Sequence, residues 1–207
     1  MIDITAILNS LAERRPFFHS EADFQYAFAW EINLARPKVD IRLEYPESTE
    51  NNRYHIDVRI ENKDEIIAVE LKYKTLSDPI GKEQYKLKSH GAQDQGRYDF
   101  IKDIQRLEHV VHAAENGKEF TGYAILLTND SNYWKGNDIS KNTADAAFKI
   151  YPGRILNGHL NWTENTSAGT KKNREKEIEL KGSYKVEWKD YKSQEDNYGF
   201  RYLAIKV

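Results

Sequence analysis

The stretch RYHIDVRIENKDEIIAVELKYKT, residues 53–75, decides the fold. It contains two runs, 53–61 and 65–74, in which apolar and polar side chains alternate. Alternation with a period of two is typical of β-strands with one buried face. Lys63 and Asp64 lie between the runs and predict a two-residue loop. The stretch is therefore predicted to form an antiparallel hairpin.

The predicted hairpin gathers ionisable side chains on one face. Because successive side chains point to opposite faces of a strand, Ile56 and Val58 are expected on the apolar face and Asp57 on the other. A loop at residues 63–64 places Asp57 directly opposite Glu70, with Cβ atoms about 4.5–5.5 Å apart. A three-residue loop would send the two carboxylates to opposite faces, so the loop geometry tests this arrangement.

Two carboxylates that face each other across a strand pair repel. At about 5 Å and an effective dielectric constant near 20, the repulsion is on the order of 3 kcal/mol. A divalent cation removes it, and hard carboxylate oxygens suit Mg²⁺ or Mn²⁺. Lys72 follows Glu70 on the same face, where it can contact a phosphate or the attacking water as negative charge develops. These parts predict a metal-assisted phosphodiester hydrolase.

Around the hairpin the sequence predicts the order helix, three mostly antiparallel strands, helix and strand. Apolar residues at helical spacing, with Asp3 and Ser20 as N-caps, indicate two helices before it. A helix between two strands makes those strands parallel in one sheet. The polar stretch 76–96 shows no sustained period. Further elements are expected as helices at 3–15, 19–35 and 97–117 and as strands at 39–45 and 120–128.

The C-terminal third gives weaker patterns. A short helix is expected at 141–149 and a loop with a basic cluster at 163–175. The sequence KEIELKGSYKVEWKDY predicts a hairpin about Lys181-Gly182, and FRYLAIKV predicts a terminal strand. The expected fold class is α/β, a single domain over residues 1–207 with a mixed central sheet flanked by helices and additional C-terminal strands.

Composition excludes several classes of protein. The chain has 207 residues, 39% of them hydrophobic and 31% charged, which fits a globular domain with a proper core. No apolar run approaches the roughly 20 residues that span a bilayer, so no membrane partner is expected. The absence of cysteine excludes disulfides, thiolate metal sites and cysteine nucleophiles. The start, MIDITAILNSLAERR, does not resemble a signal peptide, and a cytoplasmic location is expected.

A strand acid followed by Glu-x-Lys on the next strand resembles the PD-(D/E)xK nucleases, the restriction-endonuclease-like superfamily. The resemblance covers about residues 17–130, which would form the αβββαβ core of that family. Residues from about 140 to 207 would be a β-rich elaboration. Ile56 stands where the family's eponymous proline would be, which is a departure from the pattern.

The resemblance implies roles for individual residues. Asp57, Glu70 and the backbone carbonyl of Leu71 would bind Mg²⁺ or Mn²⁺, and Lys72 would be the catalytic lysine. Many members add a glutamate from the first core helix to the catalytic and metal-binding set, and Glu21 is the candidate here. Nucleic acid would be contacted by polar residues around this cleft, for which the candidates are Gln25, Lys74, Asp103 and Arg106.

The implied function is a divalent-metal-dependent deoxyribonuclease with DNA as its substrate. Lys72, beside two carboxylates, is expected to stay protonated, so it would stabilise charge or orient the water. Two alternatives stay open: a catalytically inactive module of the same fold that acts in nucleic-acid binding or complex assembly, and a ribonuclease. The oligomeric state also stays open, with a homodimer as one of the expected forms.

Each candidate residue also has an ordinary structural interpretation. Five Asp/Glu-x-Lys patterns occur in the chain, and charges on a strand are commonly a solvated face. Glu21 lies in the first helical turn, where acids favour the helix dipole. Asp103 and Arg106, three residues apart, could form a surface ion pair. The basic run at 171–176 is either a solvated loop or a contact to a duplex backbone.

Overall fold

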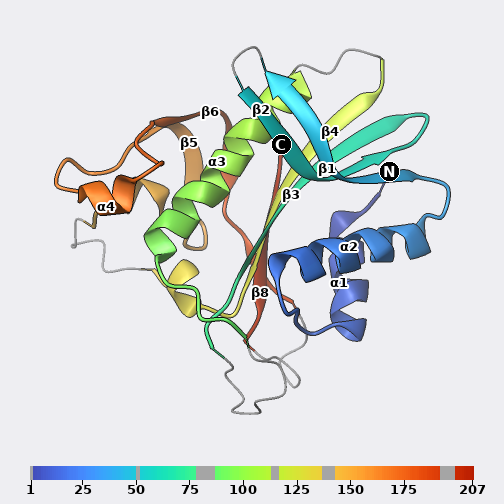
Figure 1. The fold of residues 1–207 in the computed structure, drawn as a ribbon, viewed down its shortest axis with the longest axis horizontal. Coiled ribbons are helices and arrows are strands. Elements are labelled where there is room, and N and C mark those ends of the chain that lie inside the picture. The colour runs from blue at the N-terminus through green and yellow to red at the C-terminus, as the bar shows by residue number, and fades with distance from the viewer. Residues whose placement is uncertain (1, 50–51, 78–86, 113–116, 137–142, 192–198) are drawn as a thin grey trace.

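The computed structural model describes residues 2–49, 52–77, 87–112, 117–136, 143–191 and 199–207 (Figure 1). Two helices, three strands, a helix and a strand follow one another along the chain in the order that the sequence predicts. The elements are α1 (Ile4–Arg14), α2 (Glu21–Ala35), β1 (Asp40–Thr49), β2 (Asn52–Glu61), β3 (Glu65–Lys74), α3 (Gln93–His112), β4 (Glu119–Thr128), β5 (Ile155–Leu160), α4 (Ala168–Lys171), β6 (Ile178–Lys185), β7 (Trp188–Asp190) and β8 (Arg201–Lys206), with 3₁₀ turns η1 (Ser131–Tyr133) and η2 (Ala146–Phe148).

The main sheet is mixed. Its strand order is β1-β2-β3-β4-β8-β7, and β5 pairs with β6 in a separate two-stranded sheet. The pair β3–β4 is parallel because α3 connects the two strands, whereas the other pairs of the main sheet are antiparallel. The predicted α/β class, the mixed sheet and the parallel pair are confirmed.

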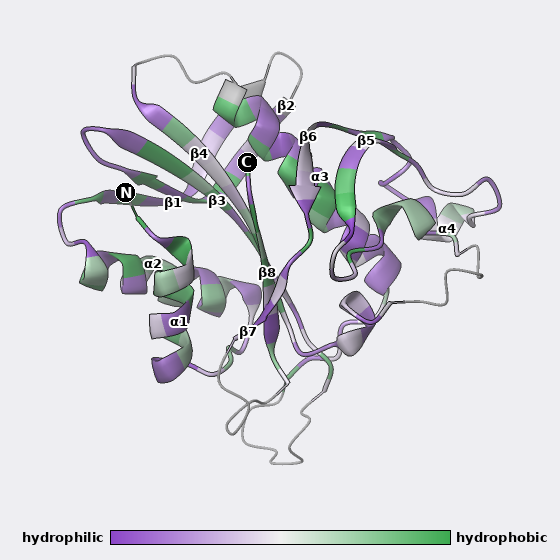
Figure 2. Ribbon diagram, turned by 180° about the vertical axis from the view of Figure 1, so that it is seen from behind, coloured by the Kyte–Doolittle hydropathy of each residue, from purple (hydrophilic) through white to green (hydrophobic). Residues whose placement is uncertain are grey.

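Helices cover both faces of the main sheet (Figure 1). α1 and α2 lie on one face, where Leu8, Phe24 and Phe28 join a buried cluster with Val69 and Leu71 of β3. α3 lies on the other face and packs with β5, β6 and residues of β4 and β8. Figure 2 shows hydrophobic and hydrophilic residues side by side along α1 and α3, as expected for helices with one buried face. No helix in the described part of the chain is long and apolar enough to cross a membrane.

The two N-terminal helices begin at the predicted caps. The side chain of Asp3 accepts a hydrogen bond from the backbone N–H of Ala6 at 3.1 Å. The hydroxyl of Ser20 accepts one from the backbone N–H of Asp23, also at 3.1 Å. Each bond satisfies an N–H group that the first helical turn leaves free.

The hairpin has the predicted loop and register. Asn62 N donates to Glu65 O at 3.0 Å, which closes the loop at Lys63-Asp64. Val58 then pairs with Val69, and the same register continues to the loop. Continued by one residue beyond the Val58–Val69 pair, this register places Asp57 opposite Glu70, at the point where β2 and β3 separate.

One detail of the predicted hairpin is wrong. Ile56 packs in the cluster on the α3 side, whereas Val58 packs on the α1/α2 side. Glu44, opposite Asp57 in the β1–β2 pair, has a left-handed backbone with φ of 50°. The backbone of β1 is thus kinked at Glu44, and beside this kink the side chains of β2 change faces between residues 56 and 58, so strict alternation fails there.

The predicted C-terminal hairpin about Lys181-Gly182 is also wrong. β6 continues through these residues and pairs with β5, a strand that the sequence pattern did not indicate. A register shift in this pair at Asn157/Gly158 leaves N–H groups on β6 for the carboxylate of Glu108, which accepts from Lys181 N at 3.0 Å and Gly182 N at 2.7 Å. The helix therefore fixes this part of β6 as a strand.

Other boundaries differ modestly from the predictions. α3 begins at Gln93, so the preceding polar segment is shorter than 76–96, and its part 78–86 lies outside the described residues. The predicted end of that helix, at 113–116, also lies outside them. Residues 146–148 form a 3₁₀ turn where a helix at 141–149 was expected, and the expected loop 163–175 contains the short α4. The terminal strand is confirmed as β8.

Candidate active site at the edge of β3

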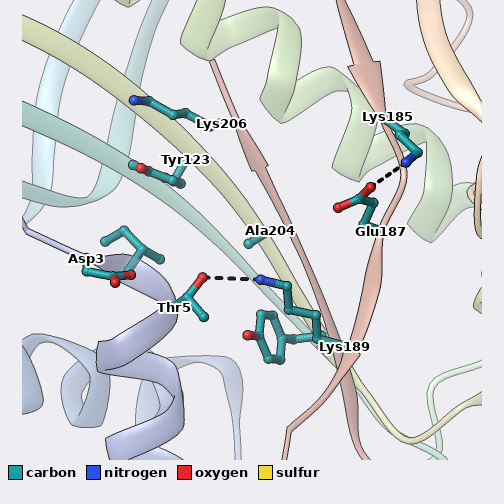
Figure 3. A pocket seen from close by; sticks show the side chains of 10 residues that line it. Asp3, Thr5, Tyr123, Lys185, Glu187, Lys189, Ala204 and Lys206 are labelled. Carbon is teal, nitrogen blue, oxygen red and sulfur yellow. Dashed lines mark hydrogen bonds and ion pairs between the residues drawn. The ribbon is translucent and has the colours of Figure 1, made fainter.

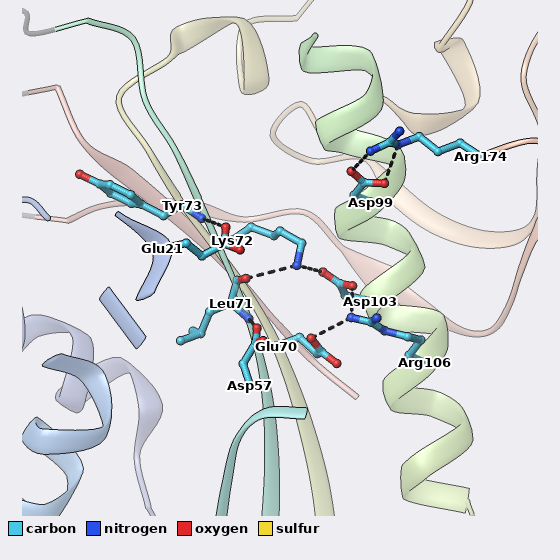
Figure 4. A network of polar contacts seen from close by, with 10 residues as sticks. All are labelled: Glu21, Asp57, Glu70, Leu71, Lys72, Tyr73, Asp99, Asp103, Arg106 and Arg174. Carbon is cyan, nitrogen blue, oxygen red and sulfur yellow. Dashed lines mark hydrogen bonds and ion pairs between the residues drawn. The ribbon is translucent and has the colours of Figure 1, made fainter. Parts of the chain in front are cut away.

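The candidate site lies where β3 extends beyond its neighbour β2. The last β2–β3 pair is Val58–Val69, while β3 continues beside β4 to Lys74. The free edge of β3 is capped by two carboxylates. Asp57 Oδ2 accepts from the backbone N–H of Leu71 at 2.6 Å, and Glu21 Oε2 accepts from that of Tyr73 at 2.8 Å (Figure 4). The free edge of β3 beyond Val69 thus forms a notch in the sheet, which is lined by the acids Glu21, Asp57 and Glu70.

α2 fixes one wall of this notch. The side-chain amide of Gln25 donates to the backbone carbonyl of Asp57 at 2.7 Å and to the carboxylate of Glu44 at 2.8 Å. The amide therefore ties the helix to both strands at the kink. Gln25, predicted to contact nucleic acid, is used here to hold Asp57 in place.

α3 provides the opposite wall. Lys72 Nζ lies 2.8 Å from Asp103 Oδ2 and donates to the carbonyl of Leu71 at 3.3 Å. Arg106 Nη2 donates to Glu70 Oε2 at 2.8 Å and to Asp103 Oδ1 at 2.5 Å. A continuous chain of alternating charges therefore runs from Lys72 through Asp103 and Arg106 to Glu70 (Figure 4).

The network holds more negative than positive groups. Glu70 is 1% exposed and Asp103 is 3% exposed, so water compensates little of their charge. The carboxylates of Glu21, Asp57, Glu70 and Asp103 face two cations, Lys72 and Arg106.

The excess of carboxylates appears in their proton affinities. Burial raises the pKa of Asp57 to about 6, and the bond from Leu71 N and the charge of Lys72 offset only part of this rise. Burial, followed by the charge of Asp103, raises the pKa of Glu70 well above its ordinary value, despite Arg106. Each uncompensated carboxylate thus holds a proton more tightly than usual.

Lys72 shows the opposite balance. Burial alone would lower the pKa of its ammonium group, but the charges of Asp103 and Glu21 outweigh burial and raise it above the ordinary value. Lys72 is therefore protonated at neutral pH. It can donate hydrogen bonds and stabilise negative charge, and it cannot act as a free base.

Two buried carboxylate oxygens of the network accept no hydrogen bond within the described residues, Asp103 Oδ2 and Glu70 Oε1, but Asp103 Oδ2 has the ammonium of Lys72 at 2.8 Å. Glu70 Oε1 is buried and accepts no hydrogen bond from any residue that the structure describes. A buried carboxylate oxygen without a donor costs free energy, and a cation is one group that can satisfy it. The carboxylate of Asp57, bonded to the N–H of Leu71, and the carbonyl of Leu71 provide further oxygen ligands on the same stretch of β2 and β3.

The donor set is small. Within the described ranges, no group of three or more His, Cys, Asp or Glu side chains is arranged to hold a metal ion. Mg²⁺ commonly takes only one or two protein carboxylates and keeps several waters, so two carboxylates and a carbonyl fit it better than they fit a metal that needs a full protein cage.

The structure thus brings together most of the predicted residues. The notch contains Asp57, Glu70, Lys72 and the carbonyl of Leu71. Glu21 lies at its other end, where it accepts a hydrogen bond from the backbone N–H of Tyr73. Arg106 is bonded to two carboxylates, and Asp103 bonds both Arg106 and Lys72. Asp103 and Arg106 form the i,i+3 ion pair that was expected, but Asp103 is buried, so this is not a surface ion pair. Lys74 lies outside this network.

Two pockets lie outside the notch. One, of about 230 Å³, lies between the start of α1 and the strands β7 and β8 (Figure 3). In its lining Lys185 pairs with Glu187 at 2.6 Å, and Lys189 donates to the hydroxyl of Thr5 at 3.5 Å. The other pocket adjoins Lys74 and includes Arg174, from the basic run 171–176, together with His90 and Tyr133, which no motif in the sequence indicated.

No family model, no curated protein and no solved structure matches this chain. The site is therefore interpreted from its own geometry and chemistry.

Proposed function

We propose that this protein is a divalent-metal-dependent nuclease that hydrolyses phosphodiester bonds of DNA. The observation that carries the proposal is the unpartnered, buried Oε1 of Glu70 beside Asp57 and the carbonyl of Leu71. Burying this excess of acid is costly for a purely structural network, and it is useful for holding a cation.

We further propose that the fold is restriction-endonuclease-like. The order α2, β1, β2, β3, α3, β4 supports this assignment, as do the parallel β3–β4 pair and the position of the acids on β2 and β3. In this interpretation β5, β6, β7 and β8 are additions to the core.

The residues of the notch divide the chemical work. Asp57, Glu70 and the carbonyl of Leu71 would hold Mg²⁺ or Mn²⁺. When bound, the metal supplies neutralisation of the phosphate charge and Lewis acidity. Asp57 uses only Oδ2 for a described hydrogen bond, so one of its oxygens stays available to a ligand.

Lys72 would bind the reacting phosphate. An ammonium group has three N–H donors; one donates to the carbonyl of Leu71, and the charge of the group also pairs with Asp103 at 2.8 Å. A remaining N–H can donate to a phosphate oxygen or to the attacking water, where it stabilises the negative charge that develops in the transition state. Asp103 and Arg106 position Lys72 and Glu70 from α3.

Cleavage assays test the proposal directly. The purified protein would be incubated with duplex, single-stranded and flapped DNA and with RNA, in Mg²⁺, in Mn²⁺ or in a chelator. We expect metal-dependent cleavage of at least one DNA form, and a loss of about 10²–10³-fold in Glu70→Gln and in Lys72→Ala. Glu179→Gln, on the exposed edge of β6, is the matched control and should cleave as the parent does. Preference for RNA would make the protein a ribonuclease.

The alternative is a non-catalytic module that retains this scaffold. The bond between Arg106 and Glu70 favours it, because Arg106 already supplies a positive charge where the metal would lie. Under this alternative no DNA or RNA is cleaved and calorimetry detects no binding of Mg²⁺ or Mn²⁺. Cleavage that Glu70→Gln leaves unchanged would equally contradict the nuclease proposal.

A further inference from the structure

A basic pocket of about 240 Å³ adjoins the notch at the C-terminal end of β3. Lys74 lies two residues beyond Lys72, about 6.6 Å along the strand. Asp99 in the pocket wall lies one helical turn before Asp103. The pocket also contains Lys88, His90 and Tyr133.

The charge of this pocket favours an anion. Lys74 and Lys88 have no ion-pair partner among the residues that the structure describes, whereas Arg174 is held by both oxygens of Asp99 at 2.7 Å. The two free lysines leave the lining with a net positive charge. The pocket also includes Gln95 and Gly96 from the first turn of the 20-residue helix α3. Their N–H groups already donate to Asp94 Oδ1 and to the carbonyl of Ala92, so this helix end contributes its positive dipole and no free donor.

A buried hydroxyl supplies an independent indication of a ligand. Tyr133 is 2% exposed, lines the pocket, and its hydroxyl has no hydrogen-bond partner in the described part of the chain. It lies so close to Gly96 that a Cβ there would be 2.2 Å from the hydroxyl oxygen. A buried donor without an acceptor is costly, and an oxygen of a bound anion would satisfy it.

His90 presents a donor on the same wall. Its Nδ1 accepts from the backbone N–H of Thr75 at 3.1 Å, so the proton of the neutral ring must be on Nε2. Burial and the charge of Lys74 lower the pKa of His90, which keeps the ring neutral at neutral pH. The ring thus offers one N–H donor, and Thr75 fixes its orientation.

We propose that this pocket binds a phosphate group of the nucleic-acid strand, next to the phosphate that the notch would cleave. Two lysines, a tyrosine hydroxyl and an imidazole N–H are the donors that tetrahedral phosphate oxygens accept from, and the dipole of α3 adds a favourable field. The group is either an internal phosphodiester or a terminal phosphomonoester. The inference rests on the proposed nuclease function for the identity of the strand, and its test needs no cleavage.

Binding without metal tests the pocket. Fluorescence anisotropy in a chelator would compare single-stranded and duplex oligonucleotides that end in a 5′-phosphate, a 3′-phosphate or hydroxyl groups only. We expect Lys74→Ala to weaken binding about tenfold and Tyr133→Phe about fivefold, since both remove donors to a charged oxygen. Lys63→Ala, in the exposed hairpin loop, removes a distant lysine and should bind as the parent does.

The arms of this assay distinguish the two sources of phosphate. A loss confined to one phosphorylated end identifies a terminal phosphomonoester, and an equal loss for all oligonucleotides identifies an internal phosphodiester. Parent-like binding of every oligonucleotide by both variants would overturn the inference. If Tyr133→Phe fails to fold, as judged by circular dichroism, the exposed Lys88→Ala takes its place.

The nuclease proposal can fail separately. Glu70→Gln leaves the pocket lining intact and should retain the phosphate-dependent binding. A protein that cleaves nothing but loses affinity in Lys74→Ala would keep the pocket and refute the nuclease. A protein that cleaves DNA but whose two pocket variants bind oligonucleotides as the parent does would keep the nuclease proposal and refute the phosphate pocket.

Discussion

Two buried acidic clusters flank α3, and their charges are balanced differently. Asp145 is 3% exposed and is bonded through Oδ2 by Nε of Arg97 at 2.7 Å, while its Oδ1 pairs with Lys149 at 3.1 Å. Glu70 is equally buried, but only one of its oxygens has a described partner. Asp145 thus has a cationic partner at both carboxylate oxygens, whereas Glu70 has one at a single oxygen.

The proton affinities of the two groups reflect this difference. Burial alone would raise the pKa of Asp145, but Arg97 and Lys149 outweigh burial and hold it below the ordinary value. At Glu70, burial and Asp103 outweigh Arg106, and the pKa is raised. A fully paired buried acid fits a structural role, whereas an under-compensated one is characteristic of a site that receives a cation or a proton.

The largest expected effect is on stability, and it separates the two clusters. Asp145→Ala leaves Arg97 buried without its partner, so the free energy of unfolding should fall by about 3–5 kcal/mol. Glu70→Gln removes repulsion with Asp103, and Arg106 keeps Asp103, so its unfolding free energy should stay within about 1 kcal/mol of the parent. Urea denaturation in a chelator measures both. A Glu70→Gln protein as unstable as Asp145→Ala would contradict the contrast.

The contributions of Asp57 and Asp145 to stability should depend on pH with opposite signs. Asp57 has a pKa of about 6 in the folded protein, above about 3.9 in the unfolded chain. The folded state therefore binds the extra proton between these values, and stability falls as the pH rises through them. In a chelator, Asp57→Asn should be more stable than the parent at pH 8 by up to about 3 kcal/mol and equal to it near pH 4.

Asp145 provides the matched comparison. Its folded pKa is lowered, so its contribution is complete above the unfolded pKa and is lost as the pH falls through the folded value. Asp145→Asn should therefore cost most stability at pH 7 and progressively less in acid. Thermal unfolding across the pH range measures both variants, and slopes of the same sign would show that Asp57 and Asp145 are not electrostatically distinct.

The smallest effect is expected at Glu21, which caps the free edge of β3. In Glu21→Gln the amide oxygen can still accept from Tyr73 N, so stability should change by no more than about 1 kcal/mol. Lys72 loses a nearby negative charge, and the pKa of its ammonium group should fall towards the ordinary value. Titration of ¹⁵N-labelled lysine by NMR would detect this fall, and an unchanged Lys72 pKa would exclude Glu21 from the network.

Much of the fold follows from local patterns in the sequence. The period-two runs, the Lys63-Asp64 loop and the caps at Asp3 and Ser20 each depend on neighbouring residues, and the structure confirms them. The register then places Asp57 next to Glu70, so the core of the candidate site could be predicted from the hairpin alone.

The remaining features depend on contacts between distant residues. The kink at Glu44 reverses the face of Ile56, and no neighbouring residue signals a left-handed glutamate. β6 runs through Lys181-Gly182 because Glu108, more than seventy positions earlier, accepts their N–H groups. The pairing of Lys72 with Asp103 and the pocket around Tyr133 likewise arise only when α3 packs on the sheet.

Calorimetric titration of Mn²⁺ or Mg²⁺ into the protein tests the central claim most directly, because binding is measured without any substrate. We predict that the parent binds at one site, that Glu70→Gln binds at least about tenfold more weakly, and that the control Glu179→Gln binds as the parent does. The absence of binding to the folded parent, or equal affinity in Glu70→Gln, would contradict the account.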